Sequence, residues 1–494
     1  MSVFNKDHAA GMLGTVLIAT AFYMLPSVAV SIYYNEIRPG VSFFCTMLVC
    51  LLAGLWLRSR VSPNKRRLKT RDGFLIITLC WVLASVVGSI PLFVSGAIPN
   101  VLDAFFESCS GFTTTGATLI NDVESTPRSV LMWRSCTVFM GGSGIILFTA
   151  FLRDFTGYGD QKISRRETPV ISYQTGGVKN KAPFYYLFSV YITLTVVLVL
   201  LFLFRGMSVY DAFIHALSLA GTGGFSSYNN GLAHFQDPIL HFIVIIAMVI
   251  TGANINVLRS IFRRGLRQTF RSTELRVYFA VILLATGLVA ADLTIQGDYL
   301  RLHHHGIAQA VMDAAFQVTS ILSTTGQYLT NFNNWPTFSR MILLALMMTG
   351  ACSASLGGGP KLHRIIVSVK FIRRGLLLKV HPNRVSVLTL NKAELSQETA
   401  TNITNHMFLY ILTVFVGSLL ISIDNFDIMT TFSATLSCIN NNGLFFGLSG
   451  HGMNFSAFSW FSKMVFSVLM IAGRLELFTV IMLFSKHYWN PDKA

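Results

Sequence analysis

The sequence predicts an all-α integral membrane protein, and three observations support this: its composition, the distribution of its charges and an internal repeat. Of its 494 residues, 52% are hydrophobic and only 12% are charged, and the mean hydropathy is +0.57. A typical soluble domain has about 25% charged residues. A chain this apolar is expected in the class of membrane proteins.

About ten stretches are apolar and long enough to cross a bilayer, which takes about 20 residues in a helix. They cover residues 12–34, 41–57, 74–95, 129–152, 184–204, 239–262, 277–296, 338–357, 403–423 and 460–485. Lys and Arg gather in four of the connecting segments, namely 58–73, 153–183, 259–276 and 361–392. Cytoplasmic loops are enriched in these residues. The pattern therefore predicts a multi-pass protein with both termini and all four basic segments in the cytoplasm.

The net charge of +16 raises the alternative of a nucleic-acid-binding protein. Such proteins carry their basic residues on a separate domain or face, whereas here these residues lie in short segments between apolar stretches. We therefore expect no nucleic-acid partner. The seven Cys residues form no CxxC pair or metal-binding spacing, and they are expected to be small buried side chains.

Four apolar segments are too short to span the membrane and end in Gly-rich or Asn-rich sequence. They begin near Val101, Val209, Ala310 and Phe426. A short helix followed by irregular backbone is tolerated at membrane depth only when it is buried or lines a watery cavity. These segments are therefore predicted to be re-entrant pore helices.

The four short segments align as an internal repeat. Asp103 precedes Gly116 by thirteen residues, and the same interval separates Asp211 from Gly224 and Asp313 from Gly326; Asp427 precedes Gly443 by sixteen. Each Asp is expected to be a helix N-cap. The predicted fold is four pseudo-symmetric helix–pore-helix–helix repeats plus two extra N-terminal transmembrane helices. The predicted units are 1–70 for the helix pair, then 71–165, 180–270, 274–375 and 400–494 for repeats 1 to 4.

A helix of about ten residues descends ~15 Å, half the hydrocarbon thickness. The C-termini of four such helices would meet near the middle of the membrane, where their partial negative charges favour a cation. A ring of backbone carbonyls at this level can replace the hydration shell of a potassium ion. The predicted selectivity-filter residues are Thr114, Thr115, Gly116, Gly223, Gly224, Thr325, Gly326, Asn442 and Gly443. The alternative is that the glycines only pack between helices.

At this point the chain resembles the Trk-type potassium-uptake proteins of the Trk/Ktr/HKT superfamily. The matching stretches are SGFTTTGAT (110–118), GTGGFS (221–226), LSTTG (322–326), CINNNGLFFG (438–447), GACSASLGGGPKLHR (350–364) and GRLE (473–476). The resemblance covers the whole chain, including the two additional N-terminal spans of the Trk subgroup.

The resemblance implies potassium uptake across the bacterial cytoplasmic (inner) membrane by a homodimer in which each subunit has its own pore. It also implies a cytosolic ring of nucleotide-binding (NAD/ATP-type) regulatory subunits docked on the basic face, with no organic cofactor on this chain. The chain has glycine at all four filter positions and in this resembles the potassium-selective members of the family. Sodium-selective relatives often carry Ser at the first filter position. The sequence departs from the family pattern at Gln327, in the bulky NNNGLFFG stretch and at Pro360.

The eighth span contains seven residues that interrupt a helix: Gly350, Ser353, Ser355, Gly357, Gly358, Gly359 and Pro360. Gly and Pro at this density do not sustain a helix. The resemblance favours a gate, an intramembrane loop that obstructs the pore when closed, and the alternative is a kink where helices cross. Arg474 lies in the middle of the last span, where a charge is costly. It is expected to face the pore and repel potassium, the alternative being a pairing with an acid on a neighbouring helix.

Other polar residues at membrane depth are expected to satisfy nearby backbone groups. They are Asn254, Asn256 and Asn440–Asn442. The outer-loop residues His303–His305 have no acidic or Cys ligands nearby and are expected to be solvated rather than to bind a metal.

A secondary transporter coupling potassium to protons or sodium is the alternative function. Coupling calls for carboxylates at the midplane, and the spans contain almost none beyond Glu107, Asp292 and Glu476. This scarcity favours passive, gated conduction. An enzyme would need a base beside a nucleophile, and neither Ser353 nor Ser355 has a His or carboxylate at a suitable spacing, so no enzymatic activity is predicted.

Overall fold

The computed structural model describes residues 6–61, 70–155, 182–254, 265, 272–296, 306–383, 387–391, 393–447, 454–485 and 488. The helices outside the four predicted short segments are α1 (Lys6–Tyr33), α2 (Ile37–Ser59), α3 (Thr70–Val94), α5 (Arg128–Phe155), α7 (Ala182–Phe204), α9 (Pro238–Gly252), α12 (Thr273–Ile295), α15 (Thr337–Met347), α16 (Leu362–Val380), α17 (Gln397–Ile421), α19 (Trp460–Arg474) and α20 (Leu477–Met482). The helices of the four predicted short segments are α4 (Val101–Phe112), α8 (Val209–Ala220), α14 (Ile307–Leu322) and α18 (Ile428–Ile439). Within the described residues the only strands are β1 (Thr389–Leu390) and β2 (Ala393–Glu394), which pair antiparallel. The predicted helical fold class is confirmed.

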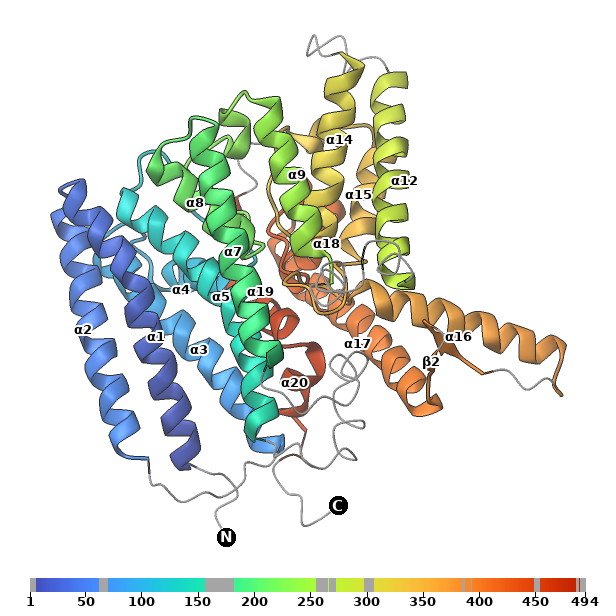
Figure 1. Ribbon diagram of the computed structural model, residues 1–494, viewed down its shortest axis with the longest axis horizontal. Coiled ribbons are helices and arrows are strands. Elements are labelled where there is room, and N and C mark those ends of the chain that lie inside the picture. The colour runs from blue at the N-terminus through green and yellow to red at the C-terminus, as the bar shows by residue number, and fades with distance from the viewer. Residues whose placement is uncertain are drawn as a thin grey trace.

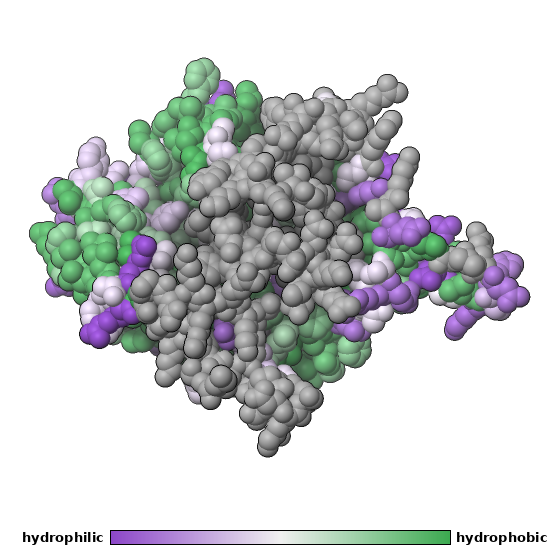
Figure 2. All heavy atoms as spheres, turned by 60° about the horizontal axis from the view of Figure 1, so that its bottom comes forward, coloured by the Kyte–Doolittle hydropathy of each residue, from purple (hydrophilic) through white to green (hydrophobic). Residues whose placement is uncertain are grey.

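Five helices in the described part of the chain are long and apolar enough to cross a membrane. They correspond to α1, α2, α3, α12 and α17, the last continuing to Asp424. On α2, Val49, Leu52 and Trp56 each expose more than half of their surface, as lipid-facing side chains do. The helices α1 and α2 pack together at one side of the bundle (Figure 1), and this side is predominantly hydrophobic (Figure 2).

The short helices α4, α8, α14 and α18 lie among the longer ones, and most of their residues are buried. One aromatic cluster shows how α4 is fixed. Trp133 of α5 is fully buried, and its ring lies edge-on to Phe43 of α2 and Phe112 of α4. The Trp133 Nε1 donates a hydrogen bond to the Gly88 carbonyl oxygen of α3 at 3.0 Å, so four helices meet at this one side chain.

The expected N-caps are correct only for Asp427, which accepts a hydrogen bond from the Thr430 amide. The caps of α4 and α8 are Asn100 and Ser208, each three residues before the predicted Asp103 and Asp211. Asp, Asn and Ser are similarly good N-caps, so residue type alone does not decide which of two nearby residues caps the helix.

The longer helix α14 begins at Ile307, which places Asp313 inside the helix, where it is buried. The register of the caps also explains the sixteen-residue interval in the fourth segment. Asp427 is a cap, whereas Asp103 and Asp211 are third residues of their helices. Thr430 is the third residue of α18, and it precedes Gly443 by thirteen residues, as in the other segments.

Two predicted spans are interrupted. The eighth stops at Met347, and α16 begins at Leu362 after a glycine-rich loop (residues 348–361) and projects from the bundle (Figure 1). The last span was expected to be continuous around Arg474, but α19 ends at this residue, and Glu476 has a φ of 63° before α20 begins. Arg474 therefore lies at a helix end rather than within a helix.

Several predicted features lie outside the described residues. They are most of the basic segments 153–183 and 259–276, and the residues Asn256 and His303–His305. Asn254 is described and follows the end of α9, rather than lying within a helical sixth span.

Candidate functional site

Each of the four short helices ends four residues before one of the predicted glycines. The last helical residues are Phe112, Ala220, Leu322 and Ile439, and the glycines are Gly116, Gly224, Gly326 and Gly443. The second residue after each helix adopts a left-handed conformation. These residues are Thr114 (φ 57°), Thr222 (φ 58°), Thr324 (φ 56°) and Asn441 (φ 53°). Positive φ is an outlier for a β-branched residue such as Thr, and strain of this kind clusters at functional sites.

The same hydrogen bond closes all four helix ends. The amide of the residue before each glycine donates to the carbonyl oxygen of a serine five residues earlier, at 2.8–2.9 Å. The four serines are Ser110, Ser218, Ser320 and Ser437. This is the helix-ending Schellman bond, in which a left-handed residue turns the chain back across the helix end. The chain therefore leaves each helix with the same geometry.

The four serines were missed in the sequence, although a signal was present. Each serine lies six residues before its glycine, and a Thr or Asn lies two residues before the same glycine. Two of the hydroxyls add a further contact to the segment that follows: Ser218 Oγ donates to the Gly223 carbonyl oxygen and Ser320 Oγ to that of Gln327.

The four glycines form a closed ring in which no side chain fits. A Cβ atom on Gly116 would collide with the Gly224 amide nitrogen, and one on Gly224 with the Gly326 carbonyl oxygen. A Cβ atom on Gly326 would collide with the Asn442 carbonyl oxygen, and one on Gly443 with the Thr115 carbonyl oxygen. Gly223 faces away from this ring, because a Cβ atom there would meet the Val138 side chain of α5.

The side chains of the other predicted filter residues Thr115, Asn442 and Thr325 bind groups beside the ring. The Thr115 hydroxyl accepts a hydrogen bond from Asn441 Nδ2 at 3.0 Å, which ties the first segment to the fourth. Asn442 Nδ2 donates to the Ile321 carbonyl oxygen of α14 at 3.3 Å. The asparagine side chains thus bind backbone and hydroxyl groups, as expected from the sequence. The Thr325 hydroxyl pairs with Ser323 Oγ at 2.7 Å within its own segment.

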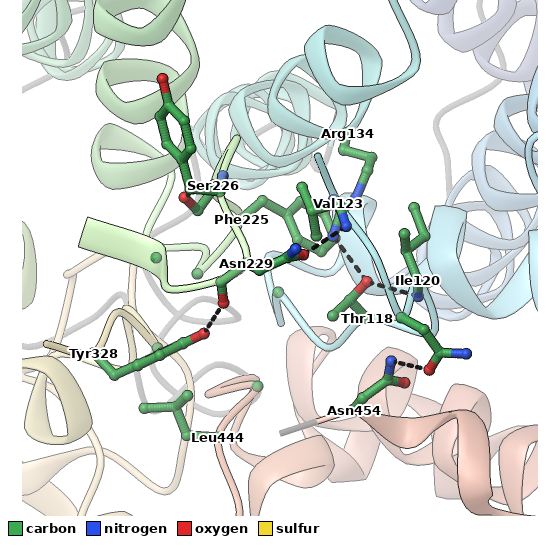
Figure 3. Close-up of a pocket in the computed structure, with 17 residues that line it drawn as sticks. Thr118, Ile120, Val123, Arg134, Phe225, Ser226, Asn229, Tyr328, Leu444 and Asn454 are labelled. Carbon is green, nitrogen blue, oxygen red and sulfur yellow. Dashed lines mark hydrogen bonds between the residues drawn. The ribbon is translucent and has the colours of Figure 1, made fainter. Parts of the chain in front are cut away.

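A cavity of about 330 Å³ opens on one side of the ring, and all four glycines line it. Polar and apolar side chains share its wall, which is made mostly by the residues that follow each glycine, with Arg134 of α5 and Asn454 beside them (Figure 3). The Tyr328 hydroxyl donates to the Asn229 carbonyl oxygen at 2.7 Å, and the Asn229 side chain accepts from the Val123 amide at 2.7 Å. These bonds join the segments that follow Gly116, Gly224 and Gly326.

The glycine-rich loop covers the opposite side of the ring. The Gly358 amide donates to the Thr324 hydroxyl at 2.7 Å, and the Thr222 hydroxyl donates to the Leu356 carbonyl oxygen at 3.3 Å. A Cβ atom on Gly358 would collide with the Asn440 carbonyl oxygen. The loop therefore touches the second, third and fourth segments on the helix side of their glycines.

Arg474 holds this loop. Its side chain is buried, with Nη1 donating to the Leu356 carbonyl oxygen at 2.7 Å and Nη2 to the Gly141 carbonyl oxygen of α5 at 3.1 Å. In the described part of the chain no carboxylate lies within ion-pair distance of it. The nearby Glu476 instead pairs with Arg364 of α16 at 2.8 Å.

Glu274 is a second residue that holds the loop, and it is not among the predicted site residues. It lies in the first turn of α12, is buried, and accepts hydrogen bonds from the Ser353 amide and hydroxyl, both at 2.6 Å. Asn254 Nδ2 donates to the same hydroxyl at 3.0 Å. The signal was that Glu274 is the only acidic residue in the basic segment 259–276.

Comparison with known proteins gives matches over almost the whole chain. The family described as "TrkH: Cation transport protein" matches residues 39–491. The Trk system potassium uptake protein TrkH of Salmonella typhimurium is 31% identical over 96% of this chain and 97% of its own length, and TrkI of Halomonas elongata is 27% identical over 97% and 96%. The crystal structure of the potassium transporter TrkH from Vibrio parahaemolyticus superposes with a TM-score of 0.83 at 28% identity, over 97% of this chain and 99% of that one. The resemblance found in the sequence is confirmed.

Proposed function

Since the chain belongs to the TrkH family of cation transport proteins, we propose that it takes up potassium ions through a gated pore at the ring of Gly116, Gly224, Gly326 and Gly443. The observation that carries the proposal is the ring itself, in which four helix ends of the same geometry bring bare backbone together. The negative ends of the four helix dipoles favour a cation there. Backbone carbonyls of the filter residues would replace its hydration shell.

The proposed organisation is that of four pseudo-symmetric repeats, 71–165, 180–270, 274–375 and 400–494, preceded by the helix pair of residues 1–70. The shared register of the four helix ends supports it. The cavity would face outward and the glycine-rich loop the cytoplasm, because the basic helix α16 directly follows the loop and basic residues favour the cytoplasmic side. Both termini would then be cytoplasmic, in a bacterial inner membrane.

The glycine-rich loop is the proposed gate, held shut by Arg474 and Glu274. We also propose a homodimer whose basic cytoplasmic face binds a ring of nucleotide-binding regulatory subunits that release the loop. The relatives are named as proteins of a "Trk system", which fits a protein that works with further components.

Replacing Glu274 with alanine is expected to raise potassium flux in the absence of regulatory subunits. The change removes two hydrogen bonds to a buried carboxylate, each worth about 1.5–3 kcal/mol, so the closed loop should become at least about tenfold less favoured relative to the open one. Flux into proteoliposomes that contain only this chain measures the effect. The control is Glu398→Ala, which removes an exposed carboxylate from the first turn of α17. Equal flux from both variants would contradict the gate.

A transporter that couples potassium to protons or sodium is the second candidate. It needs carboxylates free to bind the coupling ion. Glu107 pairs with Arg134 at 2.8 Å, Glu476 pairs with Arg364, and Asp292 accepts the Ser339 hydroxyl at 2.6 Å. Because all three are engaged, passive conduction is favoured.

Expression of the chain is expected to restore growth of a potassium-uptake-deficient bacterium at low potassium, where the empty vector does not. In proteoliposomes the reversal potential should follow the potassium gradient alone, because no coupled ion crosses with it. Imposing a pH or sodium gradient at fixed potassium tests this directly. A reversal potential that moves with either gradient supports the coupled alternative, and absence of both growth and conductance refutes the proposed function.

A further inference from the structure

A buried ion pair lies directly behind the first filter segment, outside the set of residues that form the ring. Glu107 of α4 and Arg134 of α5 are joined by Nε and Oε1 at 2.8 Å, and their side chains are 0% and 3% exposed. Placing two charges in a nonpolar interior is costly, and a hydrophobic pair of the same size is often as stable. An ion pair here therefore calls for a specific role.

Both members of the pair converge on Thr118, two residues after Gly116. The Thr118 hydroxyl donates to Glu107 Oε1 at 3.0 Å. It accepts from Arg134 Nη2 at 2.9 Å (Figure 3). The other Glu107 oxygen accepts the Leu119 amide at 2.8 Å. The backbone that follows Gly116 is thus fixed by charge-assisted bonds, which are about twice as strong as neutral ones.

Arg134 reaches the second segment as well. Its guanidinium lies 4.1 Å from the ring centre of Phe225, the residue that follows Gly224. Both side chains line the cavity above the ring. One buried cation therefore spans the two neighbouring segments whose glycines are in contact.

The other segments are held differently. The residues that correspond to Glu107, nine positions before their glycines, are His215, Gln317 and Ala434. The second segment is held by Asp211, which accepts the Ser227 hydroxyl at 2.7 Å, and the fourth by Ser433, which accepts the Phe446 amide at 2.9 Å. Among the described residues, only the first segment is attached through an ion pair.

We infer that the Glu107–Arg134 pair, acting through Thr118, positions the first filter segment and thereby determines the discrimination of potassium against sodium. The inference rests on the proposed function. Sodium is the smaller ion, so it is bound well only when the carbonyls move inward. A segment anchored behind the ring resists that movement, and loosening the anchor should admit sodium.

The test measures bi-ionic potassium–sodium reversal potentials for wild type, Arg134→Gln, Glu107→Gln and Thr118→Val in proteoliposomes. The first two variants should lower the potassium-to-sodium permeability ratio about tenfold, as expected when a charge-assisted anchor is lost. Thr118→Val preserves shape and removes only the bridging hydroxyl, so the ratio should fall about threefold. Arg134→Lys should keep more selectivity than Arg134→Gln, because lysine keeps the positive charge although it lacks the planar guanidinium group with its several N–H donors.

The matched control is Lys463→Gln. Lys463 pairs with Asp103 at 2.9 Å and also joins a helix to α4, but Asp103 lies in the first turn of that helix and binds Lys463, whereas Glu107 binds Thr118. Its selectivity should equal that of wild type. If Arg134→Gln does not fold, Thr118→Val decides the question. Wild-type selectivity in Thr118→Val and in every folded pair variant overturns the inference and leaves the proposed function standing, whereas a wild-type protein without potassium conductance overturns the proposed function.

Discussion

Replacing Gly116 with serine is expected to lower potassium uptake at least about tenfold and to raise the permeability of sodium relative to potassium. Two features of Gly116 forbid a side chain. Its φ is 78°, a conformation that costs an L-residue about 1–2 kcal/mol. A Cβ atom would also overlap the Gly224 amide nitrogen, which belongs to backbone rather than to a flexible side chain. The ring must therefore widen or shift to accept the change.

The measurement is potassium-dependent growth and uptake in a potassium-uptake-deficient bacterium, followed by bi-ionic reversal potentials of the purified protein. The matched control is Gly287→Ser. Gly287 lies in α12, and a Cβ atom there would meet nothing within 4 Å. The control should grow as wild type does. Wild-type uptake and selectivity in Gly116→Ser would show that Gly116 is not part of a filter.

The register of the four segments was predictable from the sequence because it depends on spacing alone. In the first three segments an interval of thirteen residues from Asp to Gly places the glycine beyond the end of a short helix, and in the fourth the interval is sixteen because Asp427 is the cap. The structure puts every helix end four residues before its glycine. The predicted caps Asp103 and Asp211 were wrong because Asn100 and Ser208 compete with them on equal terms, and the choice depends on where the preceding chain enters the helix.

The residues that hold the loop and the filter could not be placed from the sequence because their partners are far away along the chain. Glu274 binds Ser353 at a separation of 79 residues, and Arg474 binds the Leu356 carbonyl oxygen at 118. A buried charge signals that a partner exists without naming it. For Arg474 the partners are backbone carbonyls, which no pattern of side chains reveals. Its position at a helix end follows from the break at Glu476.

The contacts between the ring and the loop support the proposal that the loop is the gate. Thr222 and Thr324, the strained residues of the second and third segments, each share a hydrogen bond with the loop. The loop therefore touches the same residues that orient the filter backbone. If the loop is the gate, as proposed, a movement that frees it would also free these two hydroxyls and so couple opening to the geometry of the ring.

Replacing Arg474 with alanine is expected to give potassium flux without regulatory subunits. The change removes two charge-assisted bonds to backbone, one of them to the loop at Leu356 and the other to α5 at Gly141, and each such bond is worth about 1.5–3 kcal/mol. It also removes a buried positive charge beneath a cation path. Both effects favour the open state, so the open probability in single-channel recordings should rise more than tenfold.

Arg474→Lys separates the loss of charge from the loss of the two backbone bonds. Lysine keeps the positive charge but lacks the planar guanidinium group that binds two carbonyl oxygens at once. If repulsion of potassium closes the path, the lysine variant should stay closed; if the tether to Leu356 and Gly141 closes it, the variant should open nearly as far as Arg474→Ala. Arg205→Ala is the control, since it removes an arginine from a partly exposed pair with Asp237. Wild-type open probability and conductance in Arg474→Ala would exclude both roles, and the loop would then be held shut by Glu274 and the threonine hydroxyls alone.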